Sequence, residues 1–188
     1  MAKRFKIRFV SGNPHKLSEA QAILHELNIE VSPFNYPIEE LQTIDTDKLV
    51  KDKAIKAFQR LGEPLFVEHT GLYLGKLNGF PGGLTQIFWD TLKADLFAEL
   101  FGNAGSNEVT AKTMICYIDG KRFHRFEGEI KGTVAPAPRG DRAFQWDCVF
   151  VPDGYDKTFA ELGAIKNTIS MRKRALDSFA SYLGTIHA

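Results

Sequence analysis

The chain has little cysteine, no long hydrophobic run and almost no excess of charge. Its two cysteines, Cys116 and Cys148, are too few in 188 residues for a disulfide scaffold, so we expect two reduced thiols. No hydrophobic run approaches the length that spans a bilayer, which excludes an integral membrane protein. The first ten residues lack the hydrophobic core of an export signal, and we therefore predict a cytoplasmic protein.

The charges nearly cancel. Lys and Arg number 24 and Asp and Glu 23, which leaves a net charge of +1. The chain as a whole therefore does not predict nucleic-acid binding. Hydrophobic residues make up 44% of the chain, which excludes intrinsic disorder because there is ample apolar surface to bury. The length predicts a single domain, residues 1–188. Phenylalanine is abundant, with 15 residues, and most of these rings must be buried.

Strand and helix patterns alternate along the chain. Apolar and charged residues alternate over residues 4–10, which predicts a strand. The remaining strands are predicted at residues 29–34, 65–68, 109–119 and 122–134, the last two joined by a hairpin turn at 120–121. Helices are predicted at residues 14–28, from 45 or 46 to 61, through 89–100, and from 167 or 168 to 184. This order predicts an α/β fold with a mixed sheet and helices on both faces.

A polar turn follows the first predicted strand. Ser11, Asn13 and Lys16 surround the expected helix N-terminus, and such a terminus offers free N–H donors to a phosphate. The segment is not a Walker A loop, because the glycine spacing and the Gly-Lys-Ser/Thr ending are missing. Taken alone, the turn is explained as well by capping of the helix as by phosphate binding.

Three further segments carry polar residues that suit a site. Glu68 ends a predicted buried strand before a glycine-rich stretch, where a carboxylate needs an ion pair or a metal. Glu39 and Glu40, taken alone, are better explained as a solvated turn. The aromatic residues of segment 144–147 can stack on a base or pack in the core, and segment 166–172 can hold a phosphate or simply cap a helix.

Taken in order, these segments resemble the inosine triphosphate pyrophosphatase family. The resemblance covers nearly the whole chain and rests on the order and spacing of short motifs: Ser11-Gly12-Asn13 with Lys16, Lys53-Ala54, Glu68-His69-Thr70-Gly71-Leu72, Phe80-Pro81-Gly82, Phe144-Gln145-Trp146-Asp147, Pro152-Asp153-Gly154-Tyr155, and Lys166 with Ser170-Met171-Arg172. It implies Mg²⁺-dependent hydrolysis of a non-standard purine nucleoside triphosphate to the monophosphate and pyrophosphate. It also implies a long mixed sheet, two lobes around a deep cleft, and a homodimer.

The resemblance implies a role for each motif position. The phosphate contacts would be Ser11, Asn13, Lys16 and Lys53. The base and sugar contacts would be Phe144, Trp146, Asp147, Lys166, Ser170, Met171 and Arg172. The catalytic residues would be Glu68 and His69, and the metal ligands Glu40, Glu68 and His69.

Two residues depart from the family pattern in ways that affect the chemistry. His69 stands where the family has a metal-binding, water-activating aspartate. Imidazole suits Mn²⁺ better than Mg²⁺, so we expect low activity with Mg²⁺ and relatively better activity with Mn²⁺. A loss of rate is expected below the ordinary histidine pKa of about 6.5. Met171 replaces a histidine that contacts the purine, so we expect looser base selection there.

Other interpretations accompany these departures. His69 can point away from the site, in which case Glu68 alone would do the work of the family aspartate. Gln145 and Cys148 also depart from the pattern, where glycine and proline are usual. The alternative function is that of a nucleotide-binding protein of the same fold with little or no catalytic turnover.

Overall fold

The computed structural model describes residues 5–102 and 105–187, so Arg4 of the first predicted strand lies outside the described residues. In this part of the chain the strands form one six-stranded sheet in the order β2-β1-β3-β4-β5-β6. β1 (Phe5–Val10) lies parallel to β2 (Ile29–Phe34) and β3 (Leu65–Leu74). Three antiparallel strands follow: β4 (Glu108–Ile118), β5 (Phe123–Val134) and β6 (Phe150–Pro152). The predicted α/β class with a mixed sheet is confirmed.

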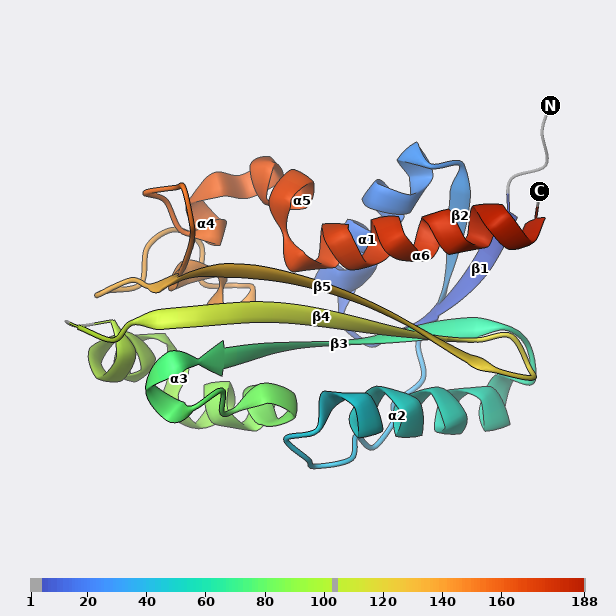
Figure 1. Cartoon of the computed structure of the whole chain (residues 1–188), viewed down its shortest axis with the longest axis horizontal. Coiled ribbons are helices and arrows are strands. Elements are labelled where there is room, and N and C mark those ends of the chain that lie inside the picture. The colour runs from blue at the N-terminus through green and yellow to red at the C-terminus, as the bar shows by residue number, and fades with distance from the viewer. Residues whose placement is uncertain (1–4, 103–104, 188) are drawn as a thin grey trace.

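Helices flank this sheet, with α6 and α2 on opposite sides of its long strands (Figure 1). The long helices are α1 (Pro14–Glu26), α2 (Thr46–Leu61), α3 (Thr85–Phe101) and α6 (Met171–His187), and the short ones are α4 (Phe159–Leu162) and α5 (Lys166–Ile169). The α2 start follows from its cap, because Asp45 Oδ1 accepts a hydrogen bond from the Lys48 backbone N–H at 3.1 Å. Within the described residues, no helix is long and apolar enough to cross a membrane.

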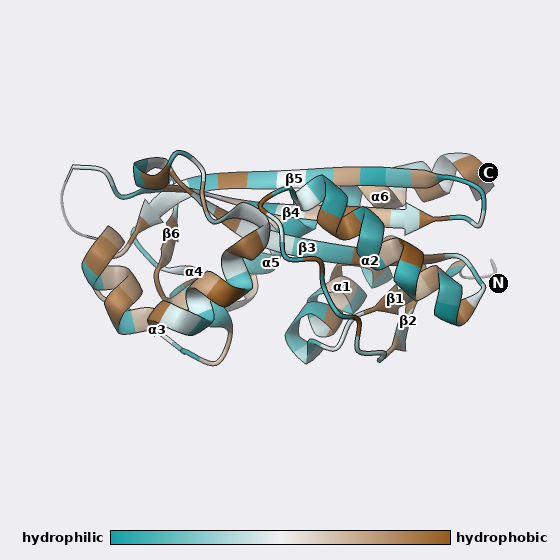
Figure 2. Ribbon diagram, turned by 90° about the horizontal axis from the view of Figure 1, so that it is seen from below, coloured by the Kyte–Doolittle hydropathy of each residue, from teal (hydrophilic) through white to brown (hydrophobic). Residues whose placement is uncertain are grey.

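Buried apolar side chains gather at the two ends of the long strands. At one end, α1 and α6 cover one face of the sheet and α2 covers the other. At the other end, a separate cluster contains Trp89 and Trp146. Figure 2 shows the ribbons of α3, α4 and β6 at this end of the sheet. The expected two-lobed arrangement therefore corresponds to two apolar ends, one with two clusters and one with a single cluster, joined by β3, β4 and β5. Both cysteines are buried and unpaired, as predicted.

β3 is longer than the sequence pattern predicts. It continues past Glu68 to Leu74 because it pairs with β4 along its whole length. The glycine that resembled a loop residue, Gly71, lies inside the strand. A Cβ at this position would lie only 2.5 Å from the carbonyl oxygen of Gly82, so this glycine allows another backbone to approach closely.

The C-terminal helix also differs from its prediction. It was expected to begin at Asn167 or Thr168, but the chain is extended at Ser170, with φ −66° and ψ 160°. Ser170 Oγ accepts a hydrogen bond from the Lys173 backbone N–H at 3.2 Å, so this serine caps α6. The helix then continues through Gly184, where the sequence predicted its end. The short strand β6 was not predicted either.

Candidate active site

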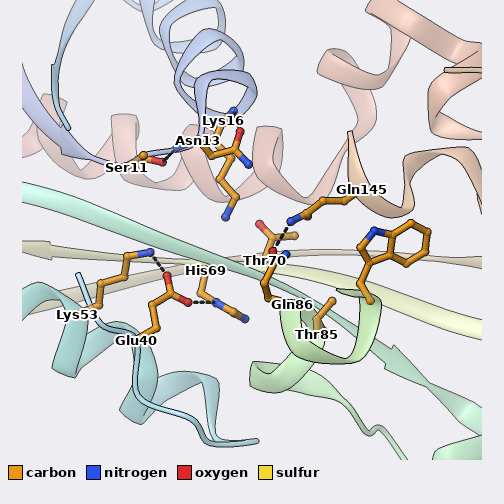
Figure 3. A pocket seen from close by; sticks show the side chains of 12 residues that line it. Ser11, Asn13, Lys16, Glu40, Lys53, His69, Thr70, Thr85, Gln86 and Gln145 are labelled. Atoms are coloured by element: carbon orange, nitrogen blue, oxygen red, sulfur yellow. Dashed lines mark hydrogen bonds and ion pairs between the residues drawn. The ribbon is translucent and has the colours of Figure 1, made fainter. Parts of the chain in front are cut away.

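A cavity of about 230 Å³ lies beside β3 at the point where β1 ends. β1 pairs with β3 only as far as Phe66, so the following segment of β3 pairs with β4 alone among the described strands. Predicted site residues from four parts of the chain line this cavity: Ser11, Asn13, Lys16, Glu40, Lys53 and His69. Figure 3 shows Lys16 and the pair formed by Lys53 and Glu40 on different sides of it. We call this space the phosphate cavity.

The turn after β1 is both a helix cap and a wall of the phosphate cavity. Asn13 Oδ1 accepts hydrogen bonds from the backbone N–H groups of His15 and Lys16, at 3.0 and 3.2 Å. Ser11 Oγ accepts one from the Asn13 N–H at 3.2 Å. The Lys16 ammonium lies 3.2 Å from Glu68 Oε1. Burial lowers the pKa of Lys16, although Glu68 opposes this effect. Capping of the α1 helix and binding of a phosphate at this turn therefore do not exclude each other.

On another side of the cavity, Glu40 lies between Lys53 and His69. Lys53 Nζ donates to Glu40 Oε1, and His69 Nδ1 is 3.8 Å from Glu40 Oε2. Burial raises the pKa of Glu40, but Lys53 outweighs this and the pKa is lowered overall. His69 Nε2 is buried and has no hydrogen-bond partner among the described residues. His69 therefore faces the cavity with one nitrogen uncommitted.

His69 is neutral at pH 7. Burial lowers its pKa to about 4, and the positive charge of Lys16 contributes in the same direction. We therefore expect the loss of rate near pH 4 rather than near pH 6.5. Glu68 and His69 are successive residues of β3, so their side chains point to opposite faces of the sheet. Glu68 contacts Lys16 and Arg172, whereas His69 faces Glu40.

Stability is expected to fall when the pH is lowered from 6.5 to 4. In this window the unfolded chain binds a proton at His69 that the folded chain does not bind, so protonation favours unfolding. A folded pKa of about 4 against an ordinary value of about 6.5 corresponds to ~3 kcal/mol once both forms are protonated. Urea unfolding at pH 7, 5.5 and 4.5 measures this effect. His69→Gln should show a shallower decline than the unmodified chain, and parallel declines would contradict the assignment.

Behind the phosphate cavity, charged residues with little exposure form a chain of alternating sign. Its members in order are Lys16, Glu68, Arg172, Glu19, Lys166 and Asp147. Arg172 donates through Nε and Nη2 to the two oxygens of Glu68 at 2.9 and 3.0 Å, and through Nη1 to Glu19. Burial raises the pKa of Glu68, but Arg172 and Lys16 outweigh this and lower it to about 2. We call this set the buried charge chain.

A second cavity of about 230 Å³ lies at the far end of the buried charge chain. Phe144, Asp147 and Lys166 line it, together with His15 and Glu19 from α1. The Lys166 ammonium lies 4.2 Å from the centre of the Phe144 ring, and the His15 ring stacks on the same ring at 4.9 Å. Burial raises the pKa of Asp147, while Lys166 opposes this shift. We call this space the aromatic cavity.

Several predicted site residues line neither cavity: Glu68, Trp146, Ser170, Met171 and Arg172. Met171 is 1% exposed and its side chain belongs to an apolar cluster. Trp146 lies in the same cluster. Conversely, sequence reasoning missed Glu19, which lies on the same face of α1 as Lys16. The spacing of three residues was the available signal.

Comparison with known proteins places the chain in a family. Residues 7–182 match the sequence profile of the Ham1 family. This chain belongs to the Ham1 family. It is 36% identical to a dITP/XTP pyrophosphatase of Methanopyrus kandleri over 94% of this chain and 95% of that protein. It is also 36% identical to an inosine triphosphate pyrophosphatase of Yarrowia lipolytica, over 93% and 94% of the two chains. A HAM1 protein structure from Coxiella burnetii superposes with a TM-score of 0.80 at 25% identity, covering 96% and 99% of the chains.

The Ham1 family is typically metal-dependent. Among the described residues, no group of three or more His, Cys, Asp or Glu side chains is placed to hold a metal ion by itself. Glu68 is held by Arg172 and Lys16, which leaves Glu40 and His69 facing the phosphate cavity. This carboxylate and imidazole fit a divalent metal that completes its coordination with substrate phosphates and water.

Proposed function

We propose that this Ham1 family member hydrolyses non-standard purine nucleoside triphosphates, those of inosine or xanthosine, to the monophosphate and pyrophosphate. The observation that carries the proposal is the pairing of two cavities. The phosphate cavity contains two lysines, and the aromatic cavity is lined by the Phe144 ring with polar groups beside it. The names of the relatives from Methanopyrus kandleri and Yarrowia lipolytica support the same substrate class.

In the proposed reaction, the phosphate cavity positions the triphosphate and an attacking water. Lys16 and Lys53 neutralise phosphate charge, and the polar turn at Ser11 and Asn13 contacts phosphate oxygens. A neutral imidazole has one free lone pair, so His69 can either coordinate a metal or accept a proton from the water, but not both at once. Its Nε2, which is uncommitted, is available for either role. Glu68 fixes the position of Lys16 rather than contacting substrate.

The aromatic cavity would hold the base. Phe144 offers a stacking surface, while Asp147 and Lys166 offer an acceptor and a donor to the edge of the base. The other residues predicted for this pocket act from behind it. Trp146 and Met171 pack in the apolar core, Ser170 caps α6, and Arg172 holds Glu19, which lines the cavity.

The proposal includes a metal site and a homodimer. Glu40 and His69 would hold a divalent metal, which supplies charge neutralisation at the phosphates when bound. One carboxylate with one imidazole suits Mn²⁺ better than Mg²⁺, as the sequence predicts. The homodimer implied by the family resemblance stays a prediction.

Pyrophosphate release from a panel of triphosphates tests the proposal. The panel contains the triphosphates of inosine, xanthosine, guanosine and adenosine, each with Mg²⁺ and then with Mn²⁺. We expect release from the first two to exceed that from adenosine triphosphate, with higher rates in Mn²⁺. Binding of these nucleotides without release from any of them would instead support the alternative of a nucleotide-binding protein.

Lys16→Ala is expected to weaken triphosphate binding by about 1.5–3 kcal/mol, the range for a hydrogen bond to a charged group. Calorimetric titration with a non-hydrolysable triphosphate measures this change. Lys48→Ala is the control, because Lys48 is exposed on α2 and forms a surface ion pair with Asp45. An unchanged affinity in Lys16→Ala would remove Lys16 from the phosphate site.

A further inference from the structure

Gln145 reaches across the phosphate cavity to α3 (Figure 3). Its Nε2 donates a hydrogen bond to Oε1 of Gln86, and the Gln86 Nε2 donates to Asp90 Oδ2 at 2.7 Å. An ionised carboxylate only accepts hydrogen bonds, so Asp90 fixes the orientation of both amides. Gln145 therefore offers the cavity one acceptor, its Oε1, and its second N–H donor.

The backbone at Gln145 makes this side chain notable. Its φ is +43°, in the left-handed region where glycine is favoured and a larger residue is strained. The Gln side chain is nevertheless present, and its amide is anchored on a different element, α3. Strain of this kind is typical of positions where the side chain has a function.

Gln145 also lies at the junction of the two cavities. It lines the phosphate cavity with Lys16, while the preceding residue, Phe144, lines the aromatic cavity with His15. The same two segments, the start of α1 and the chain around residue 145, therefore contribute to both spaces. A nucleotide with its base on Phe144 and its phosphates at Lys16 would place its pentose beside Gln145.

The Gln145 amide matches the pentose of such a nucleotide better than its phosphates as a hydrogen-bond partner. Phosphate oxygens only accept hydrogen bonds, so the amide oxygen is a poor partner for them. Pentose hydroxyls both donate and accept, as the amide does. We propose that Gln145, oriented by Gln86, is a specificity-determining residue that hydrogen-bonds the pentose hydroxyls and favours nucleotides that carry them. This inference rests on the proposed function.

The test compares inosine triphosphate with its 2′,3′-dideoxy analogue. The unmodified enzyme should show a kcat/KM about two- to tenfold higher for the ribonucleotide, as expected for a neutral hydrogen bond. Gln145→Met keeps the length of the side chain and the backbone strain but removes the amide, so its ratio should approach one. Gln86→Met leaves the amide of Gln145 without its orienting partner and should give an intermediate ratio.

Gln59→Met, at an exposed position of α2, is the matched control and should keep the ratio of the unmodified enzyme. No preference for inosine triphosphate over its dideoxy analogue in the unmodified enzyme, or a preference retained in Gln145→Met, would overturn the inference. If neither substrate releases pyrophosphate, the proposed function fails separately. Calorimetric affinities of the two nucleotides for the same four proteins then give the ratio that decides the role of Gln145.

Discussion

Arg172→Met is expected to lower the free energy of unfolding by about 3–5 kcal/mol, because it takes from two buried carboxylates the cation that they share. Arg172 is 1% exposed and is the central cation of the buried charge chain. Its removal leaves Glu68 with only Lys16 and Glu19 with only Lys166 as a charged partner. Small domains have a total stability of about 5–15 kcal/mol, so the loss would be a large fraction of it. Urea unfolding at pH 7 measures the effect.

A matched control for this prediction is Arg142→Met. Arg142 also makes two hydrogen bonds to one carboxylate, that of Asp95, at 2.9 and 3.1 Å, but both partners are exposed. Its replacement should leave stability nearly unchanged, because solvent screens such pairs. Adding Glu68→Gln and Glu19→Gln to Arg172→Met should restore part of the lost stability. Similar losses in the two arginine variants would show that burial of the charge chain is not the cause.

His69→Asp is expected to raise the Mg²⁺-dependent rate of pyrophosphate release. Aspartate places a second carboxylate beside Glu40, and Mg²⁺ prefers oxygen ligands to imidazole. General base catalysis typically raises a reaction rate by 10²–10⁴-fold. Neutral His69 already supplies a part of this acceleration, so we expect the rate of pyrophosphate release with Mg²⁺ to increase by roughly ten- to hundredfold in His69→Asp. The preference for Mn²⁺ over Mg²⁺ should decrease in the same variant. Rates with both metals, together with the Mg²⁺ affinity in the presence of a non-hydrolysable triphosphate, measure these changes.

His69→Asn separates the charge of the new carboxylate from its shape. Asparagine is close in size to aspartate but neither carries the charge nor accepts a proton, so this variant should not gain rate. If His69→Asp leaves both the rate and the metal preference unchanged, Glu68 does the work of the family aspartate. A gain from a very low starting rate would instead support the alternative of a nucleotide-binding protein with little turnover.

The fold was predictable where the signal is local. The alternation in β1 and the turn between β4 and β5 depend on neighbouring residues, and both predictions are confirmed. The second half of β3 was missed because the polar residues from Glu68 to Thr70, followed by Gly71, interrupt the apolar pattern of a buried strand. The polar side chains there are satisfied by partners distant in sequence, such as Arg172 and Thr113, which no local window contains.

The site was predictable only in part for the same reason. The turn at Ser11 and Asn13 could be found from its helix-capping pattern, whereas the roles of Lys53 and His69 came from the family resemblance. Glu19 resembled a solvated helix residue, since its partner Lys166 lies 147 residues further along the chain. The protonation state of His69 could not be predicted from the sequence, because its low pKa depends on its burial in the folded chain.

The separation of the apolar cores has a spectroscopic consequence. Both tryptophans belong to the cluster at the α3 end, and Trp89 also lines the phosphate cavity. Tryptophan emission therefore reports on that end and on nucleotide entry. The opposite end contains a group of rings with Tyr117 and Tyr182 but without tryptophan among the described residues. Tryptophan emission thus follows one end of the molecule without any added label, whereas tyrosine absorbance reports on both ends, because Tyr73 and Tyr155 lie at the α3 end.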